Sequence, residues 1–188
     1  MLSGALSATA ALTFMAGAPA VAGVPESIRI GAKQVPYISN RALTVRDTGI
    51  SRAVIVIHGS GRQVEDYFDS IVDNIPSTSP GRDWRRRTIV LAPYFQEKED
   101  AQDRKREAWW KDDWVSGGSS GGVSSYAVVD TLVARLRDGT FPNLRWVVIT
   151  GHSAGGQFVQ RYAAFTDIDL RSGPNTALVK FVPSNPSS

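Results

Sequence analysis

The segment Leu144–Gly156 reads LRWVVITGHSAGG and joins two different patterns. Its first half is rich in branched apolar side chains, which predicts a buried strand at 144–150. Its second half, GHSAG at 151–155, has the spacing Gly-x-Ser-x-Gly. Small residues at these places let a strand and the following helix approach closely around a sharp turn. We therefore predict that Ser153 is a nucleophile held on this turn, in preference to an ordinary Gly-Ser loop.

Apolar runs and helical periodicity alternate along the rest of the chain. Apolar runs predict buried strands at 52–58 and 88–93, and alternating patterns predict strands at 27–30, 41–46 and 176–182. Helical spacing predicts helices at 64–75, 123–136 and 158–165, the first of them ended by Pro76. This order predicts an α/β fold with a mostly parallel, doubly wound sheet and helices on both faces.

A second glycine-rich motif, HGSG at 58–61, follows the first strongly apolar strand. Acyl transfer requires backbone N–H groups aimed at the oxygen that becomes negative, and a glycine-rich loop can present them. Ser60 and Gly61 are the candidate donors in this loop, and Ala154 is the candidate donor next to the nucleophile. Alone the motif is weak evidence, but a serine turn in the same parallel sheet makes it specific.

With the motifs HGSG at 58–61 and GHSAGG at 151–156, the chain resembles an α/β-hydrolase from about residue 27 onward. The resemblance implies a serine hydrolase of the esterase, lipase or peptidase type. It matches Ser153 to the nucleophile and the amides of Ala154 and Ser60 to the oxyanion hole. It also implies a small-molecule ester or amide substrate.

The expected partners of the nucleophile are not found in the sequence. In this family the acid and the histidine follow the serine, but no histidine follows Ser153 here. His152 is expected to flank the turn and His58 to orient the oxyanion loop by bonding to the backbone, with a role as base the lesser alternative. Asp167 and Asp169 are expected at the opposite edge of the sheet as solvated carboxylates. We therefore expect a hydrolase domain truncated after its sixth strand.

The segment AWWKDDWV at 108–115 follows a predicted strand and should lie at the edge of the sheet where open α/β folds bind ligands. Trp109, Trp110 and Trp114 have two equal interpretations. They form an aromatic wall of the substrate pocket, or they cover the core under a long loop.

The first 22 residues carry no charged side chain and end in AVA. This pattern predicts a cleaved secretory signal, in preference to a membrane anchor or a disordered tail, and a secreted or periplasmic domain at 23–188. Apart from this segment, no stretch is long and apolar enough to predict stable membrane insertion. A net charge of +3 from dispersed Lys and Arg does not indicate nucleic acid. The absence of cysteine excludes disulfides and cysteine-based metal sites. We expect neither a metal nor a cofactor, and the oligomeric state is left open.

Two other classes of function compete with a serine hydrolase. A non-catalytic binding protein could keep the hydrolase fold and its pocket without the chemistry. A nucleotide-binding domain could use the turn at 59–61, but Val64 stands where the third glycine of that fingerprint is required. The second alternative is therefore the weaker one.

Overall fold

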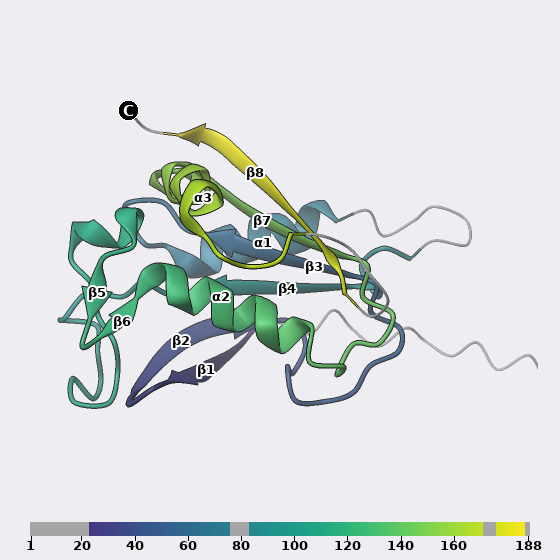
Figure 1. The fold of residues 1–188 in the computed structure, drawn as a ribbon, viewed down its shortest axis with the longest axis horizontal. Helices are drawn as coiled ribbons and strands as arrows, with labels where there is room; N and C mark the ends of the chain where they lie inside the picture. Colours follow the sequence, from purple (N-terminus) through teal and green to yellow (C-terminus); the bar gives the residue numbers. More distant parts are fainter. Residues whose placement is uncertain (1–22, 76–82, 171–175, 187–188) are drawn as a thin grey trace, which may run out of the picture.

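The computed structural model describes residues 23–75, 83–170 and 176–186. The predicted secretory signal at 1–22 and the predicted helix stop at Pro76 lie outside these residues. The described part contains a six-stranded sheet with the strand order β1-β2-β4-β3-β7-β8 (Figure 1). Strands β4, β3, β7 and β8 are mutually parallel, and the hairpin β1-β2 joins β4 in the antiparallel direction. The predicted mostly parallel α/β sheet is confirmed.

The sheet strands are β1 (Val24–Ile30), β2 (Lys33–Ser39), β3 (Arg52–Ile57), β4 (Thr88–Pro93), β7 (Trp146–Ser153) and β8 (Leu178–Pro186). The helices are α1 (Val64–Asn74), α2 (Ser125–Leu136) and α3 (Ala154–Phe165), with a 3-10 turn η1 (Asp112–Ser116). A small hairpin, β5 (Ser119–Ser120) and β6 (Val123–Ser124), precedes α2.

The helices cover the two faces of the sheet and bury alternate strand residues. On one face, Ile55, Ile57 and Ile149 join the large core cluster under α2 and α3. On the other face, Val56 and Val90 pack under α1. The central strands are apolar on both faces because both faces are covered, as expected for parallel strands. Figure 1 shows that the parallel strands end at the edge of the sheet where η1, β5 and β6 lie.

The strand predicted at 41–46 is wrong, because this segment forms turns and irregular structure. The second strand is β2, which pairs with β1 through the tight turn at Gly31, where φ is +59°. Pro36 lies within β2, and proline usually argues against a strand because it removes a ladder donor. The second strand was therefore predicted at 41–46, where polarity alternates, and not at 33–39, where β2 lies.

Strand β8 lies at one edge of the sheet and pairs only with β7 among the described residues. Its face toward α3 is packed, whereas on the opposite face Val182 and Ser184 are exposed. The same face of β7 carries Trp146 and His152, which are also exposed. In the described part of the chain, no helix is both long and apolar enough to cross a membrane.

Candidate active site

Ser153 lies where β7 turns into α3, and its backbone has an unusual conformation. Its φ is +56° and its ψ is −122°, a region that residues with a side chain rarely adopt. Serine at the N-cap of a helix normally accepts a hydrogen bond from the first turn, but the Ser153 side chain makes no such bond. Ser153 is half-buried, and its hydroxyl is not used to cap α3, which leaves it available for other chemistry.

The small residues around Ser153 are required by close backbone contacts. A Cβ atom on Gly155 would lie 2.6 Å from the carbonyl oxygen of His58 and closer still to that of Ile57. A Cβ on Gly151 would lie 2.6 Å from the carbonyl carbon of Gly155. Nothing larger than glycine fits at either place without moving backbone. These contacts also bring the end of β3 against the turn.

The HGSG loop consequently lies beside the serine turn. A Cβ on Gly59 would approach the Tyr67 hydroxyl and would lie 3.8 Å from the His152 carbonyl oxygen. Ser60 and Gly61 are exposed, and within the described residues neither of their amides donates a hydrogen bond. Ala154 is the first residue of α3, so its N–H precedes the intrahelical bonds. Gly59 thus brings the loop that carries Ser60 and Gly61 to the turn, and the role of the three predicted donors toward an oxyanion stays a prediction.

His58 is fully buried, and both of its ring nitrogens are bonded to backbone. Nε2 accepts a hydrogen bond from the Phe95 N–H at 3.1 Å, and Nδ1 lies 2.9 Å from the carbonyl oxygen of Gly59. These partners require a neutral ring that carries its proton on Nδ1. Burial, aided by the charge of Arg62, lowers the pKa of His58 to about 4. The structure therefore supports the loop-orienting interpretation of His58 over the interpretation as a base for Ser153.

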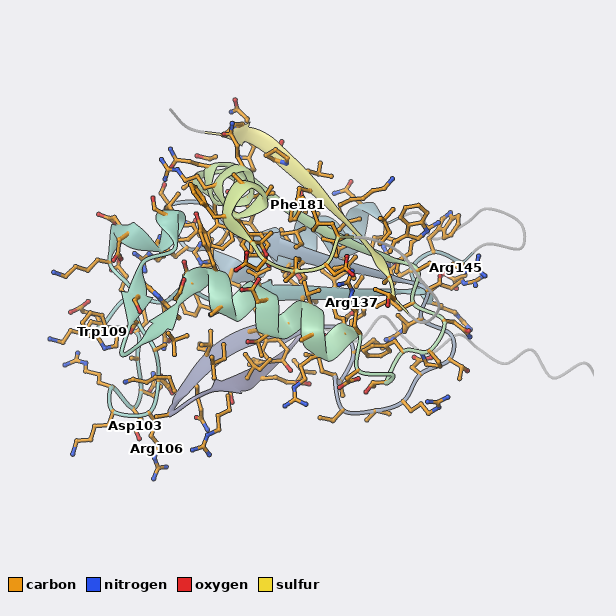
Figure 2. All side chains as sticks on the ribbon, in the orientation of Figure 1. Asp103, Arg106, Trp109, Arg137, Arg145 and Phe181 are labelled. Carbon is orange, nitrogen blue, oxygen red and sulfur yellow. The ribbon has the colours of Figure 1, made fainter. Side chains whose placement is uncertain are left out.

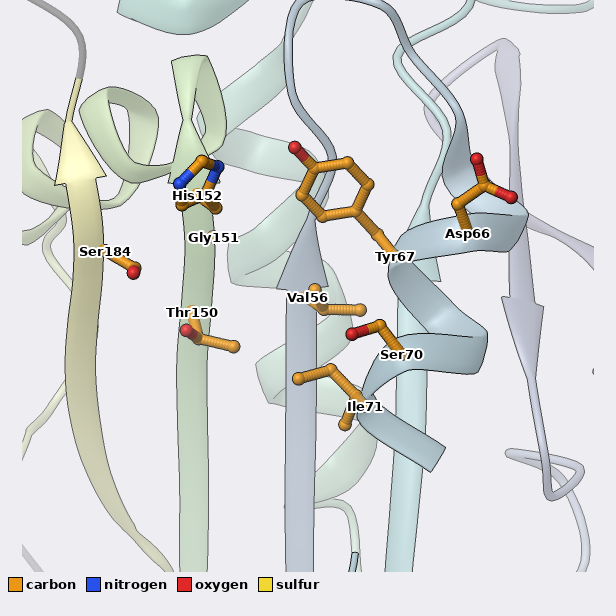
Figure 3. Close-up of a pocket in the computed structure, with 9 residues that line it drawn as sticks. All are labelled: Val56, Asp66, Tyr67, Ser70, Ile71, Thr150, Gly151, His152 and Ser184. Atoms are coloured by element: carbon orange, nitrogen blue, oxygen red, sulfur yellow. The ribbon is translucent and has the colours of Figure 1, made fainter. Parts of the chain in front are cut away.

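His152 is exposed and lines a pocket of about 370 Å³ on the α1 face of the sheet. Figure 3 shows Tyr67 of α1 and His152 of β7 on either side of the end of β3, with Ser184 on β8 beyond them. The other lining residues are Val56, Asp66, Ser70, Ile71, Thr150 and Gly151. The sequence prediction missed this pocket because its walls come from elements far apart in the chain.

Two of the three tryptophans belong to the core instead of an open substrate wall. Trp110 is 2% exposed and Trp114 is 1% exposed. The Trp114 ring lies 4.7 Å from the His58 ring and stacks on Phe95 at 5.3 Å, so it packs against the buried end of the HGSG loop. Trp109 is half-buried, and Figure 2 shows it near β5 and β6. For Trp110 and Trp114 the pocket-wall interpretation is wrong, because the long loop buries large aromatic surface.

Asp167 and Asp169 follow the end of α3 and are exposed, as predicted. Arg137, which follows the last residue of α2, donates a 2.7 Å hydrogen bond to the carbonyl oxygen of Asp169. This contact places the two carboxylates at the far end of α3 from Ser153. Among the described residues, no group of three His, Cys, Asp or Glu side chains could hold a metal ion.

The arrangement of sheet, helices and serine turn defines an α/β-hydrolase-like fold. No protein-family model and no curated protein matches the sequence. Solved structures do match. A poly(aspartic acid) hydrolase-1 from Sphingomonas sp. KT-1 aligns with a TM-score of 0.52 at 21% identity, covering 74% of this chain and 50% of that chain. The LpqC poly(3-hydroxybutyrate) depolymerase from Bordetella parapertussis aligns with a TM-score of 0.52 at 24% identity, covering 77% of this chain and 47% of that chain.

These alignments establish the fold of the chain, and the chain spans about half the length of the two structures. A fold alone does not determine an activity, which depends on the local chemistry of particular residues. Ser153 on its strained turn and the amides beside it are the candidates for such chemistry.

Proposed function

We propose that the chain is a serine hydrolase domain that acts on an ester or amide through an acyl-enzyme on Ser153. The observation that supports this function best is the Ser153 backbone, with φ of +56° and a hydroxyl that does not cap α3. Strained conformations of this kind persist where the surrounding structure enforces them, and they cluster at functional sites. Here the close backbone contacts at Gly151 and Gly155 enforce the Ser153 conformation.

In the proposed reaction the Ser153 Oγ attacks the carbonyl carbon of the substrate, and the carbonyl oxygen takes up the electron pair of the broken π bond. The amides of Ala154 and of Ser60 or Gly61 stabilise the resulting oxyanion. Collapse of the intermediate breaks the bond to the alcohol or amine, which takes a proton from solvent as it leaves, and the acyl group stays on Oγ. Water then attacks the acyl-enzyme and releases the acid.

A base must accept the Ser153 proton, and we propose solvent as that acceptor. His58 is excluded from this role because its ring is buried and both nitrogens are bonded. Without a base and an acid, an oxyanion hole still retains a rate about 10³–10⁴-fold above that in water. With solvent as the base, the proposed hydrolase therefore turns over slowly.

The names of the two similar structures, a poly(aspartic acid) hydrolase and a poly(3-hydroxybutyrate) depolymerase, agree with the proposal. Both ring nitrogens of His58 are bonded to backbone, so His58 cannot serve as a base. This favours a second candidate, a binding protein with the hydrolase fold and no turnover. In that case the pocket lined by Tyr67 and His152 would bind a ligand that is not converted.

A fluorophosphonate probe separates the two candidates. Such a probe phosphonylates a serine that lies beside oxyanion-stabilising amides, slowly where solvent is the base, so we expect the label on Ser153 after long incubation and its loss in Ser153→Ala. Ser119→Ala removes an exposed serine of β5 and should leave the label in place. A folded chain that remains unlabelled would favour the binding protein, and a label that persists in Ser153→Ala would show that Ser153 is not the nucleophile.

A further inference from the structure

Arg62 is a buried arginine directly after the HGSG loop, and it has no direct part in the reaction proposed for Ser153. It is 7% exposed, although arginine is rarely buried without specific partners. Its φ is +57°, in the left-handed region where glycine is the usual residue. An arginine in that conformation indicates that the side chain is needed at this position.

The guanidinium of Arg62 binds the backbone of two distant segments. Nη1 donates to the carbonyl oxygen of Phe95 at 2.6 Å and to that of Trp110 at 3.0 Å. The carboxylates of Glu97 and Asp112 are farther away, at 3.5 Å from Nε and 3.8 Å from Nη2, and both are largely exposed. Ion pairs with exposed partners contribute little, so the buried bonds to the two carbonyls dominate.

Phe95 holds both ends of the loop. Its N–H donates to His58 and its carbonyl oxygen accepts from Arg62. Between these anchors, the Arg62 N–H donates to the Gly59 carbonyl oxygen at 3.1 Å and closes a turn whose central residues are Ser60 and Gly61. The Gly59 carbonyl also lies within bonding distance of His58 Nδ1.

Fixing the Gly59 carbonyl fixes the direction of the next amide. The peptide between Gly59 and Ser60 is planar, so the Ser60 N–H points opposite to the Gly59 C=O. Arg62 constrains this peptide twice, through its own N–H and through the anchor of its side chain. Removal of the side chain leaves the turn without one of its two attachments to Phe95.

We propose that Arg62 is a positioning residue, which holds the Ser60 and Gly61 amides in the orientation that receives the oxyanion of the substrate. This inference rests on the proposed function for the identity of the bound group. Its structural part, the anchoring of the loop by the guanidinium, is independent of that function.

The test compares Arg62→Lys and Arg62→Gly with matched variants of Arg137. Arg137 also donates to two backbone carbonyls, those of Asp169 and Ala177. It lies directly after the C-terminal end of α2 (Figure 2). Arg62→Lys removes the guanidinium anchor and keeps the strained backbone, whereas Arg62→Gly removes both. Comparison of the two variants therefore separates the effect of the anchor from that of the strain. Glu97→Gln and Asp112→Asn remove the exposed carboxylates and keep the carbonyl bonds.

Two quantities are measured, the NMR order parameters of the Ser60 and Gly61 amides and the rate of phosphonylation of Ser153. We expect wild-type order parameters of about 0.85 and values below about 0.6 in both Arg62 variants. The labelling rate should fall about 10- to 1000-fold, since loss of one oxyanion donor costs about 10²–10³-fold. Arg137→Lys, Glu97→Gln and Asp112→Asn should keep the wild-type values of both quantities.

Rigid amides in Arg62→Lys and Arg62→Gly, with only global stability reduced, would overturn the proposal. The same holds if the Arg137 variants mobilise the loop equally. If the folded wild type is not labelled at all, the proposed hydrolase function fails. The order parameters then still decide whether Arg62 holds the loop.

Discussion

At the scale of single residues, glycine is the determinant that the sequence exposes most clearly. Gly151 and Gly155 were predicted to permit a tight turn, and the backbone contacts of both residues confirm that need. Arg62 was not predicted, because its carbonyl partners lie 33 and 48 residues away. A local pattern reports local steric demands, whereas a long-range anchor is visible only after folding.

Gly155→Ala should destabilise the protein by about 2 kcal/mol or more, because the new methyl group meets the carbonyl oxygens of Ile57 and His58. It should also abolish labelling of Ser153, since the turn must move. Urea denaturation and fluorophosphonate labelling measure the two effects. Gly49→Ala is the control, because its Cβ meets only one carboxylate oxygen of Asp47, at 3.0 Å. Equal stability of the two variants would contradict the account.

His58 should make stability depend on pH below neutrality. Its pKa is lowered from 6.5 to about 4 in the folded protein, so the unfolded chain binds more protons between these values. The contribution of His58 is therefore complete above about pH 6.5 and is lost as the pH falls toward about 4. We expect a loss of about 1 kcal/mol in the free energy of unfolding between about pH 7.5 and about pH 5.5.

Urea denaturation at the two pH values measures this slope, and His58→Asn should flatten it. His152→Gln removes the exposed histidine and keeps His58, so the slope should persist. A His58→Asn variant with an unchanged slope would show that His58 does not titrate in this way.

At the scale of elements, the buried strands and amphipathic helices were predictable because their apolar periods are strong. The hairpin β1-β2 was only half predicted, since Pro36 obscured its second strand. The loop between β4 and α2 was the least predictable element. Its tryptophans have the same sequence pattern whether they face solvent or the core, and only packing against His58 and Phe95 decides the outcome.

Helix α3 offers a direct test of the aromatic cluster under the site. Phe158 is fully buried, and its ring lies within 6 Å of those of Phe95, Trp114 and Tyr162. Phe158→Ala should cost about 3–5 kcal/mol in the free energy of unfolding. Phe165→Ala changes a side chain of the same helix that is 73% exposed and should cost less than about 0.5 kcal/mol. If the two variants lowered the urea midpoint equally, the assignment of the Phe158 face of α3 to the core would be wrong.

At the scale of the whole molecule, one face of β7 and β8 is exposed within the described residues. Val182 is 49% exposed there, next to the open edge of the described sheet. Exposed edges and apolar faces favour association. We expect the isolated chain to self-associate with rising concentration, as sedimentation velocity can measure.

Val182→Glu should weaken this association because it places a charge on the open face. Val45→Glu, at a loop residue that is 62% exposed, is the matched control and should leave the association unchanged. A wild-type chain that stays monomeric over the whole concentration range would contradict the prediction.

The central claim is that Ser153 and the neighbouring amides form one catalytic unit. A crystal structure of the chain after reaction with a fluorophosphonate tests this claim most directly. The account predicts phosphorus bonded to Ser153 Oγ, with the phosphoryl oxygen about 2.7–3.1 Å from the amide nitrogens of Ala154 and of Ser60 or Gly61. A folded chain with an unmodified Ser153, or an adduct whose oxygen points into solvent, would contradict it.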